Sequence, residues 1–113
     1  MGGFSTGEQV EAIVNGTIGK LLRQYYPALE DYRKAITVTR EDLESYLLGH
    51  PAITGSLLSR RLAQEPIHEQ ILIIETAHGY EVGESDHGTP IFLKPFSSRE
   101  KALADVLLSE LGM

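Results

Sequence analysis

The segment QILIIETAHGYEVGESDHGTPIFLKPF, residues 70–96, decides the fold. Residues 71–74 form a continuous apolar, largely β-branched run, which is typical of a strand buried on both faces. Residues 77–79 indicate a tight turn, and Tyr80-Glu81-Val82 then alternates as a half-buried strand does. We therefore predict a three-stranded antiparallel meander, with a second turn at 83–88 and a third strand at 89–94.

Helical patterns flank this meander. Ser5 and Glu8 form a capping box before apolar residues at helical spacing, so we predict one helix over 6–25 and a short second helix from Pro27 to Ala35. A second capping box, Ser97 and Glu100, starts a last helix that ends at Gly112. This helix has the only wide apolar face after the meander, so it should pack on the sheet, burying Leu103 and Leu107 against Ile73.

Residues 36–66 complete the helical region. Residues 36–38 are a short β-prone run, and Thr39 caps the helix that follows. Gly49-His50-Pro51 breaks this helix, and residues 51–64 form another, in which Arg61 falls on the apolar side and either interrupts it or pairs with a carboxylate. The prediction is an α+β fold: N-terminal helices, a three-stranded antiparallel meander and a C-terminal helix packed on the sheet. It forms one domain, 1–113, in which residues 1–66 are helical and residues 67–113 form the meander and the C-terminal helix.

Charge is distributed unevenly along the chain. The 113 residues carry a formal net charge of −6, and residues 67–96 hold one lysine against five carboxylates. The chain contains no cysteine, its N-terminus lacks the basic start of a signal peptide, and its apolar runs are far shorter than the roughly 20 residues of a transmembrane helix. We expect a cytoplasmic protein without a membrane span.

The acidic meander favours a protein partner with a basic surface. The predicted binding residues are Glu75, Glu81, Glu84 and Asp86, together with Tyr25 and Tyr26, since tyrosine is enriched at protein interfaces. The leading hypothesis is a small, acidic, non-enzymatic protein-binding module, such as an inhibitor or immunity-type protein. The sequence leaves the oligomeric state open, a homodimer included.

The alternative is a winged-helix DNA-binding transcriptional regulator. Residues 39–64 would form its helix-turn-helix and residues 70–94 its wing. Ser56, Ser59 and Arg60 would then project from the recognition helix toward the DNA. The acidic wing argues against this hypothesis, because it would be repelled by DNA phosphates.

No catalytic signature is present. The chain has neither a Gly-x-Ser-x-Gly elbow nor a Gly-rich phosphate loop, so we expect no enzyme and no cofactor. His78 and His87, with nearby carboxylates, are metal-ligand types, but their spacing matches no metal motif and we predict no metal site.

Overall fold

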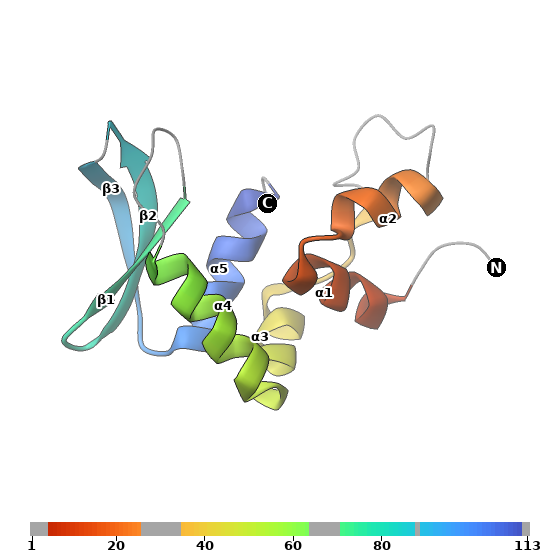
Figure 1. Cartoon of the computed structure of the whole chain (residues 1–113), viewed down its shortest axis with the longest axis horizontal. Coiled ribbons are helices and arrows are strands. Elements are labelled where there is room, and N and C mark those ends of the chain that lie inside the picture. The colour runs from red at the N-terminus through yellow and green to blue at the C-terminus, as the bar shows by residue number, and fades with distance from the viewer. Residues whose placement is uncertain (1–4, 26–34, 64–70, 88, 112–113) are drawn as a thin grey trace.

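The computed structural model describes residues 5–25, 35–63, 71–87 and 89–111, which form five helices and one antiparallel sheet of three strands (Figure 1). The predicted α+β fold is confirmed. The elements are α1 Thr6–Asn15, α2 Ile18–Tyr25, α3 Arg40–Gly49, α4 Pro51–Ala63, β1 Ile71–Thr76, β2 Gly79–Asp86, β3 Thr89–Phe96 and α5 Arg99–Glu110.

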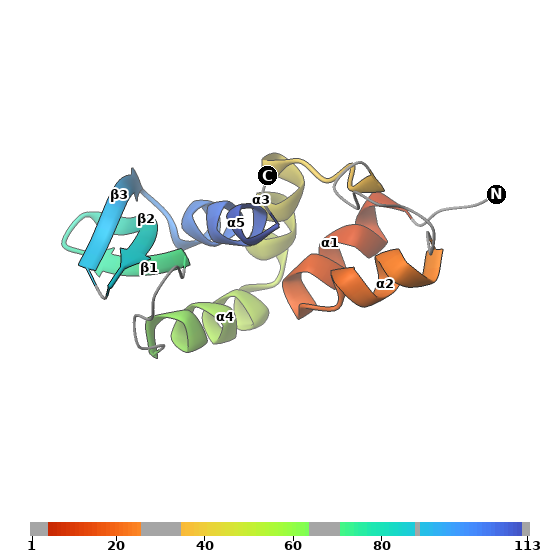
Figure 2. The same cartoon turned by 90° about the horizontal axis from the view of Figure 1, so that it is seen from above.

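The molecule is elongated, with a long axis of 47 Å. Figures 1 and 2 show the sheet at one end, α1 and α2 at the other, and α3, α4 and α5 between them. One hydrophobic cluster contains side chains from all five helices and from β1 and β2. Ile73, Leu103 and Leu107 all belong to it, as predicted, so α5 covers the sheet.

The predicted helix over 6–25 is wrong as a single element. Gly16 adopts a left-handed conformation with φ 76° and divides it into α1 and α2. The amide of Gly16 donates to Ile13 and that of Thr17 to Ala12, which is the Schellman arrangement that ends helices. Gly16, the residue type best suited to a left-handed conformation, therefore ends α1. The apolar periodicity continues on α2.

Two further local predictions are wrong. Residues 36–38 form no strand, because the Thr37 amide donates to the Gln9 side chain at 2.8 Å and not to a neighbouring strand. Ser98, not Ser97, caps α5 by accepting from the Lys101 amide. Gly112 and most of the predicted helix from Pro27 to Ala35 lie outside the described residues, whereas the capping boxes that start at Ser5 and Thr39 are both present.

The meander is confirmed, with longer strands than the sequence indicated. Leu72 and Ile73 point to opposite faces of β1 and both are buried, as expected for a strand covered on both sides. The second turn lies within the predicted 83–88 but is shorter, because β2 continues to Asp86 and β3 begins at Thr89. Gly83 lies inside this strand, at a break in the register between β2 and β3.

We predict that Leu107→Ala lowers the free energy of unfolding by about 2–5 kcal/mol, because Leu107 is a buried member of the core between α5 and its neighbours. Urea unfolding measures this loss. Leu48→Ala is the matched control, since Leu48 is 66% exposed and its removal should cost less than about 0.5 kcal/mol. Equal losses in the two variants would contradict the packing of α5.

Candidate functional site

A β-bulge on the edge strand β3 is the most unusual backbone feature of the sheet. Glu84 faces Ile91 and Val82 faces Lys94, so Gly83 alone is opposite both Phe92 and Leu93. A Cβ atom on Gly83 would lie 2.5 Å from the Ile91 carbonyl oxygen and 2.7 Å from a Leu93 methyl. Only glycine therefore fits at this position of β2.

The bulge holds Phe92 in a strained and exposed conformation. Its φ is 54°, in the left-handed region that bulky side chains rarely adopt. Its side chain is also the most exposed large apolar one among the described residues, at 76%. Because the ring is exposed, its burial does not offset the energetic cost of this backbone strain. Backbone strain of this kind is concentrated at functional sites.

A cavity of about 310 Å³ opens beside Phe92, between the sheet and α5. Its lining combines apolar, acidic and basic side chains from four elements. The polar and aromatic members are Glu84, Phe92, Lys94, Asp105 and Ser109. A volume of this size accommodates one side chain or a small molecule.

Asp105 is the buried charge of this cavity, with only 1% of the residue exposed. Arg40 Nη1 lies 2.8 Å from one carboxylate oxygen, Oδ1. Lys94 Nζ lies 3.6 Å from the other, Oδ2, which accepts no hydrogen bond within the described portion of the chain. A buried carboxylate needs such compensation, and the buried Oδ2 atom receives it from the charge of Lys94 without a hydrogen bond from the described residues.

The sheet separates the four predicted acidic residues. Directly opposed residues share a face, so Glu75 and Glu84 lie on the same face as α5, at opposite ends of the hairpin. Asp86 shares the face of Glu84 by alternation, whereas Glu81 lies on the other face. Only Glu84 lines the cavity. The four carboxylates therefore form no continuous acidic surface, and Glu84 is the one that is both adjacent to the bulge and part of the cavity lining.

The other predicted binding residues that the structure describes belong to α2 and α4 and do not line this cavity. Tyr25 ends α2, with a side chain that lies outside the described structure, as does Tyr26. Ser56, Ser59 and Arg60 are all exposed on α4, as the DNA-binding hypothesis requires.

Three basic side chains lie on or beside α4, because Arg60 and Arg61 belong to this helix and the Arg99 guanidinium lies next to Gly55. Arg40, Arg61, Lys94 and Arg99 form ion pairs with carboxylates. The remaining basic residues of the described ranges are dispersed over three helices: Lys20 and Arg23 on α2, Arg60 on α4 and Lys101 on α5.

The two histidines of the meander lie at opposite ends of β2, because His78 precedes this eight-residue strand and His87 follows it. They cannot bind the same ion across a strand of roughly 25 Å. The described ranges contain no cluster of three or more metal-ligand side chains. No helix within them is long and apolar enough to cross a membrane.

Sequence reasoning missed Phe92, Gly83 and Asp105. The available signals were a glycine inside a strand pattern, which indicates a bulge, and an aspartate within the apolar run of α5. No family model, curated protein or solved structure matches this chain. The candidate site therefore rests on its geometry.

We predict that Gly83→Ala destabilises the protein by about 1–3 kcal/mol, because the added methyl group must displace the β3 backbone or Leu93. Gly55→Ala on α4 is the matched control. Its new Cβ would lie 3.6 Å from Arg99, an ordinary contact, so the variant should gain about 0.5–1 kcal/mol from helix propensity. Urea unfolding compares the two variants, and a tolerated Gly83→Ala would contradict the bulge geometry.

Proposed function

We propose that this chain is a small, non-enzymatic protein-binding module that acts in the cytoplasm and recognises a basic protein through the bulge of β3. The observation that carries the proposal is Phe92, a strained aromatic residue with 76% of its surface exposed. Aromatic residues, phenylalanine among them, are enriched in the cores of protein interfaces relative to the rest of the protein surface.

Recognition at this edge proceeds through side chains and not by addition of a strand. Pro90 and Pro95 on β3 have no amide hydrogen to donate, and the bulge interrupts the regular ladder between them. These features already protect the edge against aggregation. The exposed carboxylates near the bulge are therefore not needed for protection, which favours a role in binding.

The chemistry around Phe92 suits an arginine side chain of the partner. The aromatic face offers a cation–π contact, and the Glu84 carboxylate, which lines the same cavity, offers an ion pair. The buried Oδ2 atom of Asp105 accepts no hydrogen bond from the residues that the structure describes. The Lys94 side chain beside it is 62% exposed and lies 3.6 Å from Oδ2, so a partner's arginine would have to displace it to reach this oxygen. Arginine has several planar donors that suit such a set of acceptors.

The charge of the sheet supports fast association with a basic partner. Residues 67–96 carry five carboxylates and one lysine, so a basic surface is attracted before contact. Within this class, an inhibitor or immunity-type protein, which covers a basic surface of its target, is the form that the charge favours.

We predict that Phe92→Ala abolishes capture of a basic partner from an extract of the native host, while the free energy of unfolding stays equal or rises. The ring is exposed, so its removal costs the folded chain little. Leu48→Ala, at another exposed apolar residue, is the control and should retain the partner. Binding is then measured with the purified partner, and equal affinity for the Phe92→Ala variant and the parent would refute the proposed surface.

Charge gives a second, independent prediction for the same partner. Glu84→Gln should weaken binding and reduce its salt dependence, because Glu84 lines the cavity beside Phe92. Glu81→Gln removes the same charge from the opposite face of β2, so its effect should be small. Equal effects in titrations at two salt concentrations would indicate general charge steering without a contact at Glu84.

The exposure of Ser56, Ser59 and Arg60 on α4 keeps DNA binding as the second candidate function. Arg61 and Arg99, the two cations nearest Arg60 on α4, are already paired with carboxylates, and this pairing and the acidic sheet argue against DNA binding. We predict no binding to duplex DNA at physiological salt in a gel-shift assay with genomic fragments. Sub-micromolar binding that is lost in Arg60→Ala would reverse the order of the two functions.

A further inference from the structure

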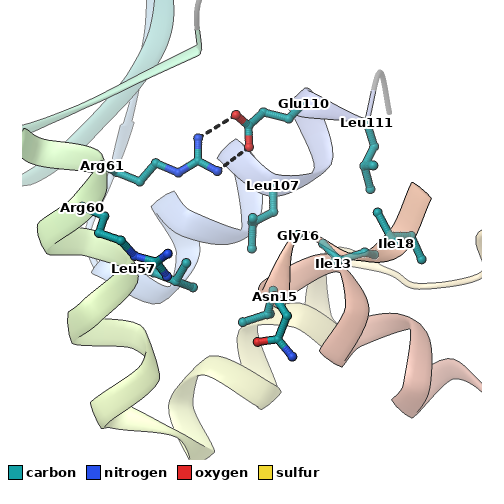
Figure 3. A pocket seen from close by; sticks show the side chains of 11 residues that line it. Ile13, Asn15, Gly16, Ile18, Leu57, Arg60, Arg61, Leu107, Glu110 and Leu111 are labelled. Carbon is teal, nitrogen blue, oxygen red and sulfur yellow. Dashed lines mark hydrogen bonds and ion pairs between the residues drawn. The ribbon is translucent and has the colours of Figure 1, made fainter. Parts of the chain in front are cut away.

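A second cavity, of about 340 Å³, lies where α1 and α2 meet α4 and α5 (Figure 3). It lies among the helices, away from the sheet, and shares no lining residue with the cavity beside Phe92. Its floor is apolar and combines side chains from several helices, among them Ile13, Ile18, Leu57 and Leu107. A cavity of this size, whose lining combines apolar side chains with several polar groups, is within the range of small-molecule sites.

One wall of this cavity is fixed by an ion pair. Both terminal nitrogens of Arg61 on α4 donate to the Glu110 carboxylate on α5, one of them at 2.6 Å. The Arg61 side chain is only 17% exposed, so its stem lies along the core, as one of the two sequence-based alternatives predicted. This bidentate pair neutralises the charge of Arg61 and holds α4 beside α5.

Arg60 presents the unbalanced charge. It lines the same cavity but is exposed, and it makes no ion pair or hydrogen bond with the described residues. Figure 3 shows its side chain extending from α4 beside Leu57, while Arg61 extends to Glu110. With Arg61 and Glu110 cancelling each other, the cavity has a net charge of +1 next to an apolar floor.

We propose that this cavity binds a small amphipathic carboxylate, such as a medium-chain fatty acid. Arg60 pairs with the carboxylate, and the hydrocarbon chain covers the apolar floor formed by α1, α2, α4 and α5. Guanidinium groups bind carboxylates through two parallel donors, which gives the ligand a defined orientation. The site is independent of the protein-binding surface at β3.

Calorimetric titration with octanoate, below the concentration at which it forms micelles, tests this site. The parent should bind octanoate, and bind both octanol and octylamine at least about tenfold more weakly, because neither carries the carboxylate that Arg60 requires. Equal affinity for the three probes, or no octanoate binding at millimolar concentration, would overturn the proposal.

Variants locate the binding. Arg60→Gln should weaken octanoate binding about tenfold or more, whereas Arg23→Gln, which removes an exposed charge on α2 outside the cavity, should leave it unchanged. Asn15→Trp places a large side chain at an exposed position on the cavity wall and should block binding. Urea unfolding checks that each variant folds. Unchanged affinity in folded Arg60→Gln or Asn15→Trp would refute the site.

Discussion

The burial of α5 is the constraint on which the other elements depend. All residues from 102 to 108 are buried, which requires neighbours around the whole helix. The sheet covers one side, and α3 and α4 cover others. A three-stranded sheet without such a covering helix is at best marginally stable. The helix thus gives both the helical region and the meander their common core.

One charged residue within α5 adds a second condition to this packing. Asp105 is buried among apolar neighbours, and its two cations come from separate segments that precede it in the sequence: Arg40 at the start of α3 and Lys94 on β3. Correct placement of α3 and β3 is therefore needed before the carboxylate is compensated. Lys94 directly follows the bulge residues Phe92 and Leu93 on β3, so its ion pair with Asp105 also fixes the position of the bulge.

The sequence predicted those features that depend on local signals. The continuous apolar run at 71–74, the capping box at Ser5, the cap at Thr39 and the proline that starts α4 each correspond to an observed element. Gly16 was visible, but the periodicity across it suggested an unbroken helix. A glycine can weaken a helix or end it, and the apolar spacing alone does not show that Gly16 takes the left-handed conformation that ends α1.

The candidate site could not be predicted in the same way. Glu84 was identified from its charge, yet its proximity to Phe92 and Asp105 depends on the register between β2 and β3. The pattern of residues 83–88, polar and bounded by glycines, favoured a turn. The bulge at Gly83 follows from the close approach of Leu93, which a single strand sequence does not reveal.

The left-handed conformation of Phe92 also has a consequence for protein engineering. Glycine adopts a φ of 54° without the steric cost that a larger residue bears, so Phe92→Gly should relieve about 1 kcal/mol of strain. A selection for thermal stability alone would therefore tend to replace this phenylalanine. If phenylalanine persists at position 92 in a population selected for both stability and activity, it contributes to activity and not to the stability of the isolated chain.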